Sequence, residues 1–375
     1  MREVVVLGAG LHRYGLFPET SIAELGAEAV RGALADANIT WENIETAYCG
    51  TTQPGWSVGH QVCQTLGFTG LGIMNIENAS ASGSSAFREA YLSVLSGEHD
   101  VALAFGVDKT KPPKLSPSGR NKDEKTAKAG DKHFTSPVEI FAAITRQHMD
   151  AYGTTIDQLA RVAVKNRHNA ALNPHAQFQS PVTIEEVHQS RMIAEPVTKL
   201  HCCPWGDGAA AVIVCEKKQA EKYTDKVCPR VAASVLKSTI PDEDPMFSLT
   251  RLCAHIAYEQ AGADPEDLDL IELHDAFTIE EIIYAEALGL CPRGEGGRLV
   301  ETGETALTGN HVINSSGGLL SMGHPLGPTG VGQIAEILWQ MRGECHKRQI
   351  RKPVNLAMAH MVGAGGVCAI HLLKK

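Results

Sequence analysis

The sequence predicts an α/β protein built from two halves of similar organisation. Short apolar runs alternate with amphipathic stretches of helical periodicity, which is typical of a parallel sheet covered by helices. In each half a turn rich in small residues precedes a helix, at residues 78–85 and 317–330. We therefore place a first half at residues 1–226 and a second half at residues 227–375.

Composition narrows the class of protein. The 375 residues are 43% hydrophobic, enough for a large core, and the net charge of −9 argues against general nucleic-acid binding. No apolar run approaches the roughly 20 residues that span a bilayer, so we expect no membrane span. The N-terminus reads as a strand and not as a signal peptide. Ten cysteines without regular spacing, Cys202 and Cys203 being adjacent, indicate free thiols, a cytoplasmic protein and no metal site.

The first half begins with an apolar run, Val4–Leu7, which we expect to be a buried parallel strand. A helix is predicted over Ser21–Ala37, because Ser21 can cap it and Glu24 stands three residues on. The elements that follow are a strand around Thr46–Cys49, a helix over Val58–Leu66, a helix over about Ala86–Ser96 and a strand at Val101–Val107.

Residues of about 109–198 form a predicted excursion from the sheet. Its first part, residues 109–133, holds seven Lys and one Arg against three acids, with Pro and Gly scattered through. Helical patterns resume at Pro137–Tyr152, Ile156–Ala171 and near Ile184–Ser190. The apolar run Asp207–Cys215 then suits a central strand that returns to the sheet.

The second half repeats this order of elements, which predicts a structural duplication. Its predicted elements are strands at Arg230–Val235, Leu268–Leu273, Val354–Ala359 and Val367–Leu373, and helices at Phe247–Ala261, Thr278–Leu288 and Val331–Met341.

Four turns beside these elements carry side chains suited to chemistry. Ser80 stands just before a helix whose free N–H groups favour negative charge, which suits a functional residue. A cluster of serines that only cap the helix is an equally good interpretation. His274-Asp275 ends a predicted strand and alone reads as a structural pair. His324, followed by Pro325 and flanked by glycines, is held on a stiff loop, which favours a function. The fourth, at residues 359–366, is a glycine-rich turn that could be only a tight hairpin. No phosphate-binding loop and no G-x-S-x-G nucleophile turn is present.

These motifs together resemble the thiolase superfamily, and most closely its sterol-carrier-protein-type members. Asn78–Ala86 resembles the nucleophile turn, Gly323-His-Pro-x-Gly-x-Thr-Gly330 the histidine loop, and Met361-x-Gly-x-Gly365 the Cys-x-Gly turn. The run from His274-Asp-Ala-Phe through Glu280 resembles the sterol-carrier type. The resemblance implies a thiolase-like five-layered α/β/α/β/α fold, in which two similar halves each have a mixed sheet covered by helices. It also implies a homodimer or tetramer that acts on acyl-CoA, with coenzyme A as co-substrate.

The resemblance assigns roles position by position. Residue Ser80 would carry the acyl group after deprotonation by His324, and His274 would bind the thioester oxygen with a water near Asn314. The backbone N–H groups of residue 80 and Gly363 would form a second oxyanion hole.

The remaining roles concern protonation and binding. His360 or His324 would protonate the departing enolate. The basic excursion, with Lys109 and Lys111, would meet the CoA phosphates, unless it is simply a solvated charged loop. Met361 and Gly318 stand at positions expected to line the substrate.

Three positions depart from the family pattern. Ser80 stands for the nucleophilic cysteine, Met361 for the cysteine of Cys-x-Gly, and Ala276 for the cysteine of His-Asp-Cys-Phe. A serine hydroxyl needs a general base at the moment of attack, and its ester exchanges slowly with a thiol. We therefore expect impaired acyl transfer.

Three explanations remain open at the level of sequence. The leading one is a thiolase that cleaves or forms a C–C bond of a 3-oxoacyl-CoA, this chain being a Cys-to-Ser form of it. The second is a retro-aldolase acting on a β-hydroxyacyl-CoA, and the third is a non-catalytic acyl-CoA-binding subunit. Some family members work with a companion protein made of a zinc ribbon and an OB-fold, and such a partner is also left open.

Overall fold

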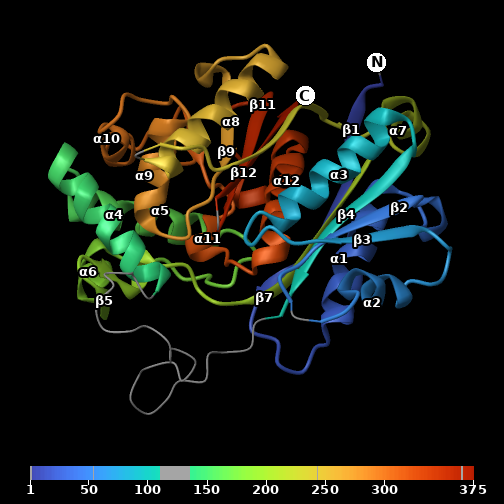
Figure 1. Cartoon of the computed structure of the whole chain (residues 1–375), viewed down its shortest axis with the longest axis horizontal. Coiled ribbons are helices and arrows are strands. Elements are labelled where there is room, and N and C mark those ends of the chain that lie inside the picture. Colours follow the sequence, from blue (N-terminus) through green and yellow to red (C-terminus); the bar gives the residue numbers. More distant parts are fainter. Residues whose placement is uncertain (1, 54, 110–135, 243, 365) are drawn as a thin grey trace.

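The computed structural model describes residues 2–53, 55–109, 136–242, 244–364 and 366–375. Within these residues, ten strands form one mixed sheet in the order β10-β9-β11-β12-β8-β1-β7-β4-β2-β3 (Figure 1). The first half supplies β1 (Val4–Gly15), β2 (Thr46–Gly50), β3 (Gly72–Ile76), β4 (Val101–Asp108) and β7 (Asp207–Glu216). The second supplies β8 (Arg230–Ser238), β9 (Leu270–Glu272), β10 (Val312–Ile313), β11 (Leu356–Gly363) and β12 (Val367–Lys374).

The two halves have the same strand topology. Counted outward from the β1–β8 contact, each half runs first, fifth, fourth, second and third strand. In each half the second strand is parallel to the third and fourth, whereas the fifth is antiparallel to the fourth and first. The duplicated order predicted from the sequence is therefore present in the fold. The boundary at residues 226/227, which falls between α7 (Lys217–Tyr223) and β8, stays a prediction.

The first strand differs from its prediction. β1 continues to Gly15 and pairs antiparallel with both β7 and β8, whereas Val4–Leu7 was expected to be parallel. A strand buried on both faces reads as the same apolar run in either direction, so its sense cannot be read from the sequence. Strands β3 and β10 were not predicted either, because β3 is largely exposed and β10 has only two residues.

Helices cover both faces of the sheet in each half, and the two halves share the central helices. The layers are therefore helix, sheet, helix, sheet and helix. One face of the first half packs on α1 (Ile22–Ala37) and α2 (Val58–Gln64), and the outer face of the second half packs on α8 (Pro245–Ala261) and α9 (Thr278–Ala287). Between the halves lie α3 (Ser82–Ser96) and α12 (Leu326–Arg342), which share one apolar core with strands of both (Figure 1). Alternation along β7 explains the split, since Ala209 and Ala211 face the outer core and Ala210 and Val212 the central one.

Helix starts follow local capping chemistry. Ser21 and Glu24 form the predicted capping box before α1. Both central helices begin four or five residues earlier than predicted, because the small-residue turns themselves supply the first helical turn. The other short elements are α7, α10 (Gly296–Glu301), α11 (Gly318–Ser321), β5 (Met192–Ala194) and β6 (Val197–Thr198).

The excursion packs on the second half of the chain. Its helices are α4 (Pro137–Tyr152), α5 (Ile156–Ala171) and α6 (Ile184–Gln189), of which α4 and α5 pack on α9 and α5 also on α10 (Figure 1). Buried pairs join them to α9, with Lys165 Nζ 2.9 Å from Glu281 Oε1 and His148 Nε2 3.2 Å from Glu286 Oε2. The basic segment beyond Lys109 lies outside the described residues.

The central helices approach each other backbone to backbone at their N-terminal turns. A Cβ placed on Gly83 would lie 2.3 Å from the Gly327 carbonyl oxygen, and one on Gly330 would lie 2.2 Å from Ser84 Oγ. Only glycine allows this approach, which brings the 78–85 turn against the 323–330 loop. In the described part of the chain, no helix is both long and apolar enough to cross a membrane.

We expect Gly83→Ala to destabilise the fold by about 1–3 kcal/mol, because the new methyl group must push apart two backbones. In an unconstrained helix the same change would stabilise by about 1 kcal/mol, so the sign of the effect is diagnostic. Urea unfolding measures it. Gly72→Ala is the matched control, since its Cβ would find Thr46 Oγ1 at 3.8 Å. A Gly83→Ala chain as stable as the parent would contradict the close approach.

Candidate active site

Ser80 lies in a strained turn at the start of α3. Ala79, just before it, has a φ of 49°, which is unusual for a residue with a Cβ. The turn is fixed by Asn78, whose backbone N–H donates to Ser82 Oγ (2.9 Å) and whose Nδ2 donates to Ser85 Oγ (2.8 Å). Ser80 is thus held, almost buried, beside the N-terminal turn of α3.

Ser80, His324 and Thr329 form a chain of hydrogen bonds. Ser80 Oγ is 3.0 Å from His324 Nε2, and His324 Nδ1 is 3.0 Å from Thr329 Oγ1. The Thr329 hydroxyl donates its own hydrogen to the Pro325 carbonyl (2.6 Å), so it must accept from Nδ1–H. Nε2 is then the nitrogen with the lone pair, aimed at the serine. Burial, with a contribution from His274, holds the pKa of His324 well below its usual range, which keeps the ring neutral.

His274 lies beside this pair. Its ring centroid is 5.5 Å from that of His324, and its Nδ1 is 3.2 Å from Glu280 Oε1. Asn314 also reaches this region, because its Oδ1 accepts from the N–H of Leu273 at 2.7 Å. His274 Nε2 and Asn314 Nδ2 are both buried, and neither has a hydrogen-bond partner among the described residues. Two free polar atoms of this kind suit a bound oxygen or water.

His360 is the third buried histidine of the region. Its Nε2 is 3.2 Å from Thr250 Oγ1, and its ring meets that of Tyr284 with centroids 4.7 Å apart. Nδ1 has no partner in the described chain. Burial, with a smaller contribution from His274, lowers the pKa of His360 to about 3, so this ring is neutral too.

The glycine-rich turn after β11 meets the serine turn. A Cβ on Gly363 would lie 2.2 Å from the Asn78 carbonyl oxygen, so the two backbones touch there. The role of Gly363 in a second oxyanion hole stays a prediction. Met361 is buried two residues before Gly363. Gly318, with a φ of 61°, packs on the side chains of Asp275 and Asn314. Substrate contacts by Gly318 and Met361 stay predictions.

Lys109 has a different environment from the one expected. Its ammonium donates to the carbonyl oxygens of Phe17 (2.8 Å), Pro18 (2.9 Å) and Thr20. An ammonium has three N–H groups, so these bonds leave none for a CoA phosphate, and the structure gives Lys109 a structural role. Lys111 lies outside the described residues.

Sequence analysis assigned no role to several residues that support the site. Thr329 orients His324, Glu280 and Tyr284 support His274, and Asp108 accepts from the Gly327 N–H (2.6 Å) at the start of α12. Asp108 also accepts from both Thr51 and Thr52, which ties the histidine loop to the segment just after β2. Local signals existed for two of these residues. Thr329 is a fixed position of the histidine-loop motif, and Glu280 occupies the third helical position of α9, where Glu often caps.

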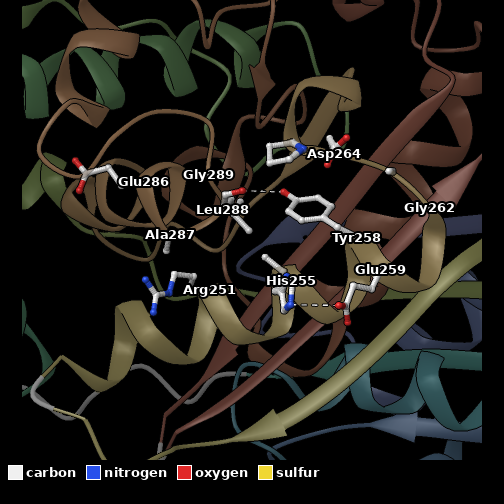
Figure 2. Close-up of a pocket in the computed structure, with 13 residues that line it drawn as sticks. Arg251, His255, Tyr258, Glu259, Gly262, Asp264, Glu286, Ala287, Leu288 and Gly289 are labelled. Carbon is white, nitrogen blue, oxygen red and sulfur yellow. Dashed lines mark hydrogen bonds and ion pairs between the residues drawn. The ribbon is translucent and has the colours of Figure 1, made fainter.

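A separate pocket of about 570 Å³ opens between α8 and the end of α9 (Figure 2). Its lining includes Arg251, His255 and Tyr258 of α8, and it contains none of the predicted catalytic residues. No group of three or more His, Cys, Asp or Glu side chains that could hold a metal ion occurs within the described ranges.

Two models of known protein families match the sequence of the chain. Residues 4–218 match the family model of the thiolase N-terminal domain, and residues 232–373 match that of the thiolase C-terminal domain-like family. The chain belongs to the thiolase family. The resemblance predicted from the motifs and the five-layered fold are confirmed.

Three relatives are similar to nearly the whole chain in sequence. It is 38% identical to an acetyl-CoA acetyltransferase of Methanothermobacter thermautotrophicus, with both chains fully covered. It is 36% identical to benzoylsuccinyl-CoA thiolase subunit BbsB of Thauera aromatica (97% and 95% covered). It is 35% identical to sterol carrier protein 2 of Oryctolagus cuniculus, covering 99% of this chain and 72% of the relative. These relatives support thiolase-family acyltransferase activity.

Among solved structures, the fold matches an "Ltp2-ChsH2(DUF35) aldolase" with a TM-score of 0.84. The two chains are 23% identical, and 99% of this chain and 98% of the other are covered. At this identity the match concerns the fold.

Thr329→Val should lower kcat for acyl transfer by about 10- to 100-fold, because Nδ1–H of His324 loses its acceptor and the tautomer is no longer fixed. Steady-state kinetics measure the change, and KM should move little. Thr329→Ser, which keeps the hydroxyl, is the matched control and should retain most of the activity. Equal rates for Val and Ser would rule out the orienting role.

The buried histidines predict that stability falls with acid. Burial lowers the pKa of both His360 and His371 to about 3; His371 is held by Ser234 Oγ (3.0 Å) and the Ser84 carbonyl (3.1 Å). Below about pH 6.5 the unfolded chain binds protons that the folded chain does not. Each such ring therefore removes about 1.4 kcal/mol of unfolding free energy per pH unit as the pH drops toward 3.

His371→Gln removes one of these titrating rings. The slope of the unfolding free energy against pH should therefore fall by about 1.4 kcal/mol per pH unit between pH 6 and 4. Urea titrations at a series of pH values measure the slope independently of any constant loss of stability. His255→Gln, at a side chain that is 70% exposed, is the comparison variant. An unchanged slope in His371→Gln would show that His371 does not contribute.

Proposed function

We propose that the chain catalyses thiolase-type cleavage or formation of a C–C bond in a 3-oxoacyl-CoA, with the acyl group carried by Ser80 and passed to coenzyme A. The observation that carries the proposal is the 3.0 Å contact of Ser80 Oγ with His324 Nε2. A nucleophile, a base and a group that orients the base form the arrangement on which covalent acyl transfer depends. The thiolase-family relatives support the same class of substrate.

In the cleavage direction, His324 Nε2 takes the proton of Ser80 as Oγ attacks the 3-oxo carbon. The oxyanion forms near the N–H groups of residue 80 and Gly363. The C2–C3 bond then breaks, its electron pair moves toward the thioester oxygen beside His274, and C2 receives a proton from His360 or His324. The thiol of a second CoA attacks the Ser80 ester and releases acyl-CoA. The proton of this thiol replaces the one given to C2, so that Oγ–H of Ser80 and the neutral imidazoles are restored.

A second candidate reaction is retro-aldol cleavage of a β-hydroxyacyl-CoA. The observation in its favour is Tyr284, whose ring contacts those of His274 and His360 and whose hydroxyl donates to Glu280. A base would remove the hydroxyl proton, the C2–C3 bond would break to release a carbonyl compound, and the enolate would be protonated at C2. This route does not need Ser80 as a nucleophile, and the fold neighbour is named as an aldolase.

The names of two similar proteins support a proposal about the binding partners of this chain. The relative from Thauera is named as a subunit, and the fold neighbour is named together with a DUF35 protein. We therefore propose a homodimer or tetramer that can also bind a companion protein with a zinc ribbon and an OB-fold. The intact Ser80–His324–Thr329 chain supports an enzyme over a non-catalytic subunit. Cytoplasmic localisation stays a prediction.

Substitutions of Ser80 separate the two reactions. With acetoacetyl-CoA and CoA, we expect slow thiolysis by the native chain, at least tenfold faster thiolysis by Ser80→Cys because a thiolate attacks readily, and none by Ser80→Ala. Mass spectrometry of the intact chain should find an acetyl group that Ser80→Ala lacks. Aldol cleavage of a 3-hydroxyacyl-CoA that persists in Ser80→Ala, without thiolysis by any form, would replace the first candidate with the second.

A further inference from the structure

The Glu280 carboxylate is fixed by three donors. It occupies the third position of α9, where Oε2 accepts from the N–H of Phe277 at 2.9 Å, as in a capping interaction. Oε1 accepts from the hydroxyl of Tyr284, one turn on, at 3.2 Å and lies 3.2 Å from His274 Nδ1. The carboxylate is 1% exposed, so its orientation is set by these contacts and not by water.

This carboxylate determines which nitrogen of His274 is free. A carboxylate only accepts hydrogen bonds, so Nδ1 must carry the hydrogen between them. Nε2, on the other side of the ring, is buried and has no partner among the described residues. A buried polar atom without a partner is costly, which indicates that Nε2 is kept for a ligand.

The free nitrogen belongs to the reacting region. The His274 ring stands almost perpendicular to that of His324, at 86° and 5.5 Å, and His324 in turn contacts Ser80. His274 also contributes to lowering the pKa of His324 and of His360, which places its ring near both. A donor role for Nε2 requires a second hydrogen on the ring, which makes His274 a cation paired with the Glu280 carboxylate 3.2 Å away.

We propose that Glu280 is a positioning residue that holds His274 with Nε2–H directed at the thioester oxygen of the acyl-CoA, with Tyr284 fixing the carboxylate. This inference rests on the proposed function. When C2 loses a proton or the C2–C3 bond breaks, the electron pair moves onto the thioester oxygen, and Nε2–H stabilises the negative charge formed there. The residue acts through His274 and does not itself touch the substrate.

Exchange of the C2 protons of acetyl-CoA in D2O, followed by ¹H NMR, tests this step alone. It requires enolate formation but neither C–C cleavage nor an acyl group on Ser80. Glu280→Gln should lower the maximal exchange rate at least about tenfold with little change in the acetyl-CoA concentration for half-maximal rate. An amide offers only one acceptor oxygen, so it cannot satisfy both Phe277 and the His274–Tyr284 pair.

Glu259→Gln, at a carboxylate that is 66% exposed on α8, is the matched control and should exchange at the native rate. Tyr284→Phe keeps the carboxylate and should give a smaller, few-fold fall, which preserves the test if Glu280→Gln does not fold. Native exchange rates in a folded Glu280→Gln chain, or in Tyr284→Phe where Glu280→Gln fails to fold, would overturn the inference, as would absence of exchange in the native chain.

The ratio of native to Glu280→Gln rates is also measured in a Ser80→Ala background. A tenfold ratio there supports the role of Glu280 even if thiolysis assays reject acyl transfer by Ser80. A ratio near one in both backgrounds rejects Glu280 while leaving acyl transfer to be judged by thiolysis. The two hypotheses therefore fail independently.

Discussion

The backbone contact between the N-terminal turns of α3 and α12 is the constraint on which the candidate site depends. Gly83 and Gly330 let the two helices approach until no side chain fits between them. Ser80 lies just before one helix, and His324 just before the other, so the 3.0 Å contact of their side chains follows from how the helices meet. Asp108 strengthens the arrangement by accepting the Gly327 N–H in the first turn of α12. Each half of the fold thus contributes one partner of the Ser80–His324 contact.

Burial determines the state of the histidines collected there. A ring removed from water loses the solvation of its charged form, which explains why the pKa values of His324 and His360 fall. Neutral rings can accept a proton, as a base must. His274 differs from them because a carboxylate lies against its Nδ1. If His274 donates as proposed, this one cluster of imidazoles contains both proton acceptors and a donor to developing negative charge.

The layered fold and the residues of the candidate site could be predicted from the sequence. The residues that orient them by hydrogen bonds were harder to predict. Glycines and small residues around Ser80 and His324 marked the turns, because close backbone approach requires such residues wherever it occurs. Strand direction in β1 escaped prediction, since burial on both faces hides it. The role of Tyr284 was also invisible, because its partner in the sequence, Glu280, matters only once β9 brings His274 alongside. Lys109 was misjudged, because the carbonyls that hold it come from about 90 residues earlier in the chain.

A serine in this setting is chemically more capable than its isolated hydroxyl suggests. It attacks only if a base removes its proton during the reaction, and a base is most effective when its lone pair already points at the hydroxyl. Thr329 supplies that condition by fixing the proton on Nδ1 of His324. A cysteine gains less from this, because a helix terminus and a neighbouring imidazole already favour its thiolate. In the proposed acyl transfer, the hydrogen-bonded chain from Thr329 to Ser80 is therefore the feature that would let a hydroxyl act in the position of a thiol.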